Sequence, residues 1–146
     1  MKLLNNIMRV NELCEGDCII VGGACSFLNN KKEEIDVRDI DIVITKESTL
    51  DKLTVLGEVV KSRNNQLFGL EVGRYHIKMV GEHTIDIFLK ESHAGHDTIK
   101  ILNKELKKDT LETQKKYLEF LIINSKKINK DVLVERFNKK LIRLCV

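Results

Sequence analysis

The stretch Arg38-Asp39-Ile40-Asp41-Ile42-Val43-Ile44 decides the fold of this chain. Isoleucines at positions 40, 42 and 44 alternate with two aspartates and a valine, which is the period-two pattern of a half-buried strand. Side chains two residues apart project from the same face of a strand, so Asp39 and Asp41 point to one side of the sheet. Two carboxylates so close repel each other unless a cation lies between them. Mg²⁺ prefers oxygen ligands and keeps part of its shell for waters and substrate phosphates, so it suits this position. The structural alternative is a turn or cap role for the two aspartates.

A glycine pair lies upstream of this strand. The apolar run 18–21 is predicted to be a buried strand that ends at Gly22-Gly23, and residues 24–29 have helical character. Glycines between a strand and a helix let the backbone approach a ligand closely, and the helix start offers free N–H groups to phosphates. Ser26 can add a hydroxyl to a phosphate oxygen. A Gly-Gly turn alone is weak evidence, and its coupling to the Asp-x-Asp strand strengthens it.

A third aspartate, Asp86, lies in the middle of the apolar run His83-Thr84-Ile85-Asp86-Ile87-Phe88-Leu89. The aliphatic residues at 85, 87 and 89 share one face of this predicted strand, which leaves Asp86 on the other face. A buried carboxylate without a partner destabilises a fold, so a functional reason is favoured. If this strand lies beside residues 39–44, Asp86 can reach the same metal ions.

The remaining patterns predict an α/β (α+β) fold. Ser48 is expected to cap a short helix, Gly81-Glu82 predicts a type II′ hairpin, and Asn64-Asn65 marks a turn. At 146 residues the chain fits a single domain, 1–146, with a catalytic core over 1–92 and a helical C-terminal part over 93–146. The predicted helices cover 2–14, 48–56, 110–124 and 129–144, and the other predicted strands cover 58–62 and 75–80.

Composition excludes several classes of protein. With 42% hydrophobic and 32% charged residues, the chain is typical of a globular protein, and no apolar run approaches the roughly 20 residues of a membrane span. The N-terminus lacks the features of a signal peptide, so we expect a cytoplasmic location. The four cysteines form no CxxC pair, which favours structural burial of reduced thiols over zinc binding.

Charge is distributed unevenly along the chain. Residues 1–99 carry 12 Lys and Arg against 16 Asp and Glu, whereas residues 100–146 carry 13 against 6. A basic segment beside an acidic half suits a protein that holds a polyanion near metal-binding carboxylates. The alternative is that these lysines form solvated helix faces.

Three segments together resemble the DNA polymerase β-like nucleotidyltransferase superfamily: VGGACSF at 21–27, RDIDIVI at 38–44 and HTIDIFL at 83–89. The resemblance covers roughly residues 17–90. It implies a small mixed β-sheet flanked by helices. It also implies two Mg²⁺ ions and transfer of a nucleoside monophosphate from an NTP such as ATP to an acceptor hydroxyl, with release of pyrophosphate. It also implies phosphate binding by Gly22, Gly23 and Ser26, metal binding by Asp39, Asp41 and Asp86, and participation of these three aspartates in catalysis.

Two subfamilies share part of the pattern. The RDID run is similar to small antibiotic nucleotidyltransferases, which usually have Gly-Gly-Trp where this chain has Gly-Gly-Ala. The Gly-Gly-Ala start is similar to tRNA CCA-adding enzymes, whose Arg-Asp dipeptide is replaced by Ser26-Phe27. The acceptor stays open between RNA or tRNA, a protein and a small molecule, and the basic C-terminal segment favours RNA. The alternative function is that of a catalytically silent binding or structural module, against which three retained carboxylates argue.

Several further side chains have two interpretations. Arg38, Arg74 or Lys78 could steady the phosphates, and spacing alone does not choose between them. His93 and His96 have the spacing of metal ligands, but a connecting loop is favoured because no third ligand is evident. The aromatic rings at 75 and 76 could stack on a base, but packing within the sheet is favoured.

Overall fold

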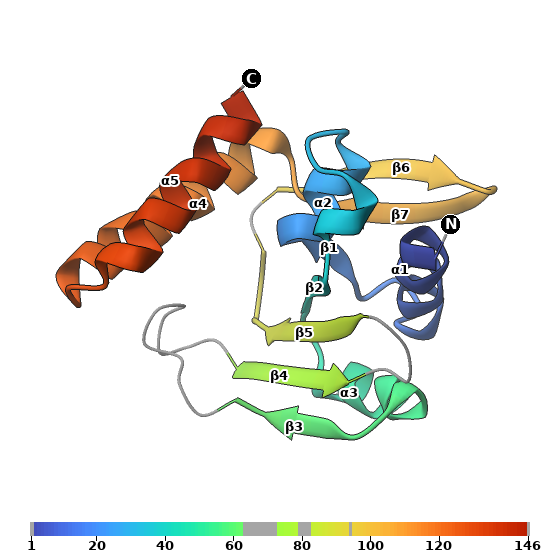
Figure 1. The fold of residues 1–146 in the computed structure, drawn as a ribbon. Coiled ribbons are helices and arrows are strands. Elements are labelled where there is room, and N and C mark those ends of the chain that lie inside the picture. Colours follow the sequence, from blue (N-terminus) through green and yellow to red (C-terminus); the bar gives the residue numbers. More distant parts are fainter. Residues whose placement is uncertain (1, 63–72, 79–82, 94, 146) are drawn as a thin grey trace.

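The computed structural model describes residues 2–62, 73–78, 83–93 and 95–145, which form a mixed sheet with flanking helices (Figure 1). The predicted fold class is confirmed. The strands are β1 (Ile19–Val21), β2 (Asp39–Ile44), β3 (Val59–Lys61), β4 (Gly73–Lys78), β5 (Thr84–Leu89), β6 (Asp97–Ile101) and β7 (Lys104–Lys108). The helices are α1 (Lys2–Leu13), α2 (Gly22–Leu28), α3 (Glu47–Leu53), α4 (Leu111–Lys127) and α5 (Asp131–Cys145), with 3₁₀ turns η1 (Glu34–Asp36) and η2 (Thr54–Leu56).

The centre of the sheet is formed by the strands that the acidic motifs predict. The strand order is β3-β4-β5-β2-β1-β7-β6. β2 runs parallel to β5 and antiparallel to β1, and its register places Asp41 opposite Asp86 on one side and Val21 on the other. The expectation that the two acidic strands lie side by side is therefore confirmed.

The main apolar core lies on one face of the sheet. Alternation along β2 sends Ile40, Ile42 and Ile44 into this core, where each is fully buried. Leu3 and Ile7 of α1, together with residues of α2 and α3, complete the same cluster. The other residues of β2 face the opposite side, which carries only a small apolar cluster around Val43. One face thus holds the fold together, and the other is left for polar groups.

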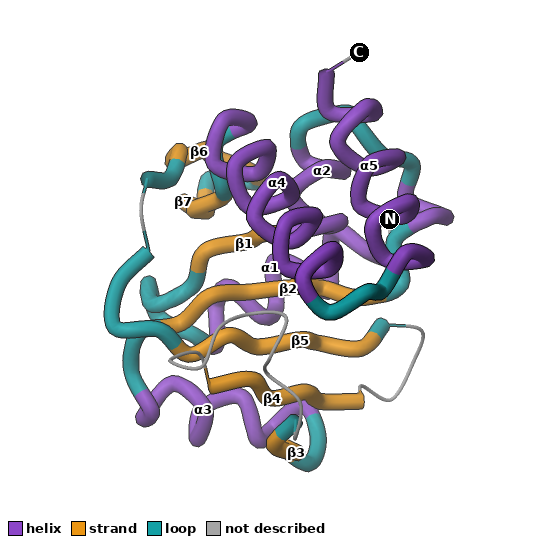
Figure 2. The backbone as a smooth tube through the Cα atoms, turned by 90° about the vertical axis from the view of Figure 1, so that its left-hand side faces the viewer, coloured by secondary structure: helices purple, strands orange, loops and turns teal. Residues whose placement is uncertain are grey.

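The α4–α5 hairpin stands over that second face (Figures 1 and 2). Thr110 caps α4 by accepting a hydrogen bond from the backbone N–H of Thr113 at 3.0 Å. The two helices pack on each other through a separate apolar cluster centred on Leu121, Ile122 and Phe137. The hairpin therefore brings its own core and forms a wall opposite the sheet.

Two strands were not predicted from the sequence. β6 and β7 form an antiparallel hairpin within the segment 93–146 that was expected to be helical, and β7 joins the sheet beside β1. Leu102 and Asn103, which connect them, both have positive φ, of 52° and 63°. Positive φ at both central positions is the geometry of a type I′ turn, which normally carries Asn-Gly or Asp-Gly. Because Leu102-Asn103 lacks this glycine, no signal in the sequence marked the hairpin.

Two local predictions at helices and cysteines need correction. The N-cap of α3 is Lys46 rather than Ser48, and the carboxylate of Asp17 supplies the capping acceptor from outside the helix, at 3.0 Å from the Lys46 N–H. Burial holds for three cysteines, Cys14, Cys18 and Cys25, whereas Cys145 is exposed. The predicted turns at 64–65 and 81–82 lie outside the described residues. None of the helices in the described part of the chain has the length and apolar character needed to cross a membrane.

Candidate active site

Three aspartates lie on one face of two neighbouring strands. Asp41 of β2 pairs with Asp86 of β5, and Asp39 lies two residues before Asp41 on the same face. All three line a cavity of about 750 Å³ between this face of the sheet and the α4–α5 hairpin. The structure thus brings together the three carboxylates that the sequence analysis singled out.

Burial and mutual repulsion change the protonation of these carboxylates. Burial, followed by the charges of Asp86 and Asp39, raises the pKa of Asp41 to about 8. Burial and the charge of Asp86 also raise the pKa of Asp39. Arg74 acts in the opposite direction on both pKa values, and its Nη2 lies 3.6 Å from Oδ2 of Asp86. Without a bound cation, burial and the neighbouring charges therefore favour the protonated form of Asp41.

The glycine pair forms the floor of the cavity beside Asp41. Gly22 begins α2 directly after β1 with a φ of 60°, a conformation that favours glycine. A Cβ atom at this position would overlap Oδ2 of Asp41, and one at Gly23 would lie 3.3 Å from Nζ of Lys32. Because both residues lack side chains and line the cavity, the backbone at the start of α2 is open to a ligand.

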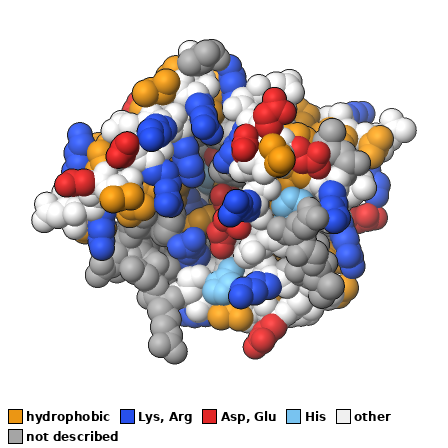
Figure 3. All heavy atoms as spheres, in the orientation of Figure 1, with side chains coloured by type: hydrophobic (Ala, Val, Ile, Leu, Met, Phe, Trp, Pro, Cys, Tyr) orange, Lys and Arg blue, Asp and Glu red, His pale blue; other side chains and the backbone are white. Residues whose placement is uncertain are grey.

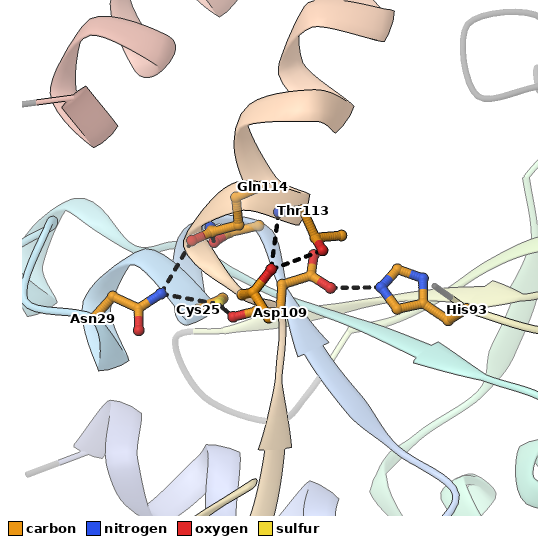
Figure 4. A network of polar contacts seen from close by, with 8 residues as sticks. Cys25, Asn29, His93, Asp109, Thr113 and Gln114 are labelled. Carbon is orange, nitrogen blue, oxygen red and sulfur yellow. Dashed lines mark hydrogen bonds and ion pairs between the residues drawn. The ribbon is translucent and has the colours of Figure 1, made fainter. Parts of the chain in front are cut away.

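Gln114 of α4 connects the hairpin to the glycine turn and to Asn29, and Figure 4 shows its contact with Asn29. Its Nε2 donates hydrogen bonds to the carbonyl oxygen of Gly22 at 3.2 Å and to Oγ of Ser26 at 3.1 Å. Its Oε1 accepts a hydrogen bond from Nδ2 of Asn29 at 3.1 Å. Ser26 lines the cavity, and because its oxygen accepts the bond from Gln114, its own O–H can still donate.

A histidine–aspartate pair borders the same cavity. Nε2 of His93 lies 2.5 Å from Oδ1 of Asp109, and the main-chain oxygen of Asp109 accepts a bond from Sγ of Cys25 at 3.4 Å (Figure 4). Both members of the pair line the cavity, whereas His96 is exposed and does not. The two histidines therefore do not act together at this site.

Cations outnumber carboxylates around the cavity. Among the residues that the structure describes, eight Lys and Arg side chains line it against four aspartates. Lys and Arg side chains gather over the α4–α5 hairpin and border a hollow in which acidic side chains are visible (Figure 3). Lys140 is close to this centre: burial and the charge of Lys32 lower its pKa, while Asp41 and Asp39 act to raise it. The basic C-terminal segment thus contributes directly to the acidic site.

Of the three cations that the sequence offered for phosphate binding, the structure places one at the cavity. Arg74 lines the cavity, whereas Arg38 lines a separate, smaller one and Lys78 is exposed at the end of β4. Tyr75 lies on the core face of the sheet, away from the cavity, and packs against the main core, as the packing interpretation expects. Sequence reasoning did not identify the contribution of Gln114, and it indicated the contribution of α5 only through the uneven charge of the two halves of the chain.

The residues present fit a magnesium–nucleotide complex. Among the described residues, no group of three or more His, Cys, Asp or Glu side chains is arranged to hold a metal ion by itself. Mg²⁺ in nucleotide sites takes one or two carboxylates and completes its shell with waters and phosphates, so it does not need such a cage. Burial and repulsion by Asp86 and Asp39 together raise the pKa of Asp41, and a divalent cation would relieve the repulsion.

Comparison with known proteins identifies the class of fold. No protein-family model and no curated protein sequence matches this chain. Among solved structures, the chain is similar to the crystal structure of ANT(2″)-Ia in complex with adenylyl-2″-tobramycin, with a TM-score of 0.50 and 12% sequence identity. The alignment covers 95% of this chain and 97% of that chain. The two chains therefore share a fold over nearly their whole lengths, and this fold agrees with the one expected from the sequence resemblance.

Proposed function

We propose that this protein is a magnesium-dependent nucleotidyltransferase that moves a nucleoside monophosphate from an NTP to an acceptor hydroxyl. The observation that carries the proposal is the meeting of Asp39, Asp41 and Asp86 at one wall of a cavity whose floor is the Gly22-Gly23 turn. A cluster of like charges at the wall of a cavity is unfavourable in itself, and a nucleotide bound with divalent cations would neutralise it.

The phosphate groups are expected to bind at the glycine turn. Gly22 and Gly23 expose the backbone there, and Ser26 offers a hydroxyl donor beside them. Lys32 lies next to Gly23, and Arg74 lies next to Asp86, so both cations border the same region of the cavity. Fixed donors and cations of this kind hold a triphosphate in position for an in-line displacement.

The transfer exchanges one phosphorus–oxygen bond for another. The acceptor oxygen forms a bond to the α-phosphorus, the bond between the α-phosphorus and its bridging oxygen breaks, and pyrophosphate leaves with the electron pair. Asp86 takes the proton of the acceptor hydroxyl as general base. Asp39, Asp41 and Asp86 would hold two Mg²⁺ ions, which supply charge neutralisation and a lowered pKa of the acceptor hydroxyl.

The experiment is a transfer assay with each of the four α-labelled NTPs, Mg²⁺ and three acceptors: single-stranded RNA, tobramycin and the protein itself. We expect label on one acceptor with wild-type protein and a loss of at least 100-fold in Asp41→Asn, because the substitution removes a metal-binding charge. Asp51→Asn, an exposed aspartate on α3, is the matched control and should keep full activity. Equal labelling by Asp41→Asn and wild type would rule out the role of Asp41, and no labelling of any acceptor would favour a silent module.

A further inference from the structure

A row of cations follows α5 along the edge of the cavity. Lys130, directly before α5, and Arg136, Lys140 and Arg143 of α5 all line the cavity, and the spacing of the last three places them on one side of the helix. At a rise of 1.5 Å per residue, the row from position 130 to position 143 extends for about 20 Å.

This row is longer than one triphosphate needs. Lys140 is the member that interacts electrostatically with Asp41 and Asp39, so it belongs to the centre of the site. Lys130 lies about 15 Å along the helix from it, and Arg143 lies one turn beyond it on the other side. Lys32 and Arg74 already border the expected triphosphate position. The ends of the row are therefore available to a second anionic group.

Apolar side chains lie between these cations. Leu133 and Phe137 of α5 and Tyr117 of α4 line the cavity together with the cationic row. Proteins that bind single-stranded nucleic acid combine a positively charged groove along the backbone with aromatic rings on which bases stack. Tyr117, which is half-buried at the cavity, offers such a ring, and a small inorganic or sugar phosphate would have no use for it.

We propose that α5 is a binding surface for single-stranded nucleic acid and that a terminal hydroxyl of this chain is the acceptor. The inference rests on the proposed transfer reaction and specifies its acceptor. Eight cations against four aspartates give the cavity a positive excess, which attracts a polyanion and repels a polycation such as an aminoglycoside. The acceptor class thus differs from the compound carried by ANT(2″)-Ia.

The test measures binding without NTP or Mg²⁺, so its result does not depend on catalysis. Fluorescence anisotropy of labelled RNA and DNA oligonucleotides, both single-stranded and of one sequence, is recorded at several salt concentrations. The variant combines Lys130→Ala with Arg143→Ala, and the control combines Lys126→Ala with Lys139→Ala, which removes two exposed lysines that do not line the cavity. Each lost phosphate contact lowers the slope of log K against log salt by about 0.7 for a single strand. We therefore expect a decrease of about 1.4 in the variant and little change in the control.

The RNA and DNA arms identify which nucleic acid the surface prefers, and tighter binding of either one supports the proposal. Equal slopes in wild type and variant, or equal losses in variant and control, would overturn it. Absence of salt-dependent binding to both oligonucleotides would also overturn it. If the transfer assay places label on tobramycin and none on the oligonucleotides, nucleic acid is rejected as the acceptor, and the proposed transfer reaction still stands.

Discussion

Gly22 and Asp41 are in such close approach that a Cβ atom at residue 22 would overlap Oδ2 of the aspartate. β1 and β2 are antiparallel neighbours, and Val21, the last residue of β1, is paired with Asp41. The backbone turn that is expected to bind phosphates is therefore in contact with one of the proposed metal ligands. A change at either residue must alter the position of the other.

Gly22→Ala should displace the carboxylate of Asp41 and lower transfer activity by at least 100-fold. It should also destabilise the fold by about 1–3 kcal/mol, because a residue with a side chain is strained at φ 60° and overlaps Oδ2. Gly16→Ala is a matched control: Gly16 has a φ of 92°, but an added Cβ meets nothing within 4 Å. Urea denaturation should show a larger loss for Gly22→Ala, and Asp41→Ala in that background should recover the difference. Equal losses for the two glycines would contradict the close-contact account.

Asp41→Asn should make the protein more stable at pH 8. In wild type the folded-state pKa of Asp41 is raised from 3.8 to about 8, so the stabilisation associated with its protonated form is complete below pH 3.8 and is lost as the pH rises through about 8. The variant lacks this titration and should gain on the order of 1 kcal/mol at pH 8, since solvent screens part of the effect. Free energies of unfolding measured in urea at pH 5, 6.5 and 8 test this. A pH dependence identical to that of wild type would show that Asp41 is not the titrating group.

Magnesium should stabilise the protein more at high pH than at neutral pH. A divalent cation binds the deprotonated carboxylate, so at pH 6.5 it must displace the proton of Asp41, whereas at pH 8.5 most of that proton is already lost. We expect a larger rise in Tm on adding Mg²⁺ at pH 8.5, and a smaller pH effect in Asp41→Asn. Sodium chloride of the same ionic strength is the control. Magnesium shifts that are equal at both pH values would argue against a role of Asp41 in binding the ion.

Gln114→Ala should weaken NTP binding as well as the fold. The substitution removes the donors to Gly22 and Ser26 and leaves a buried gap, for which a loss of about 1–3 kcal/mol is expected. Asn11→Ala removes an exposed hydrogen bond to the carbonyl oxygen of Glu105, far from the cavity, and should change neither property. Calorimetric titration with NTP in the presence of Mg²⁺ measures the difference. Unchanged NTP affinity in Gln114→Ala would show that the network does not position the phosphate-binding turn.

The acidic centre could be predicted because the pattern that specifies it lies within two short stretches of sequence. Alternation along residues 39–44 and 84–89 gives both the strands and the face on which each aspartate lies. Pairing of β2 with β5 could only be stated as a condition, since the sequence does not specify which strands are neighbours. The register that sets Asp41 beside Asp86 comes from the packing of the whole sheet.

The parts that were missed depend on contacts between distant residues. β6 and β7 contain many lysines, and the Leu102-Asn103 connection lacks the glycine that normally marks a type I′ turn. Gln114 is one polar residue in a helix, and nothing local indicates that it reaches Gly22. The cations of α5 have the spacing of a solvated helix face, and only the position of the hairpin over the sheet turns that face toward the aspartates.

The separate apolar clusters of the sheet and of the α4–α5 hairpin have an evolutionary consequence. If α5 binds the acceptor as we propose, substitutions along it can alter which molecule is bound while the aspartates on the sheet keep their positions. Evolution could therefore change the acceptor by substitutions in the hairpin alone, while the reaction at the aspartates stays the same.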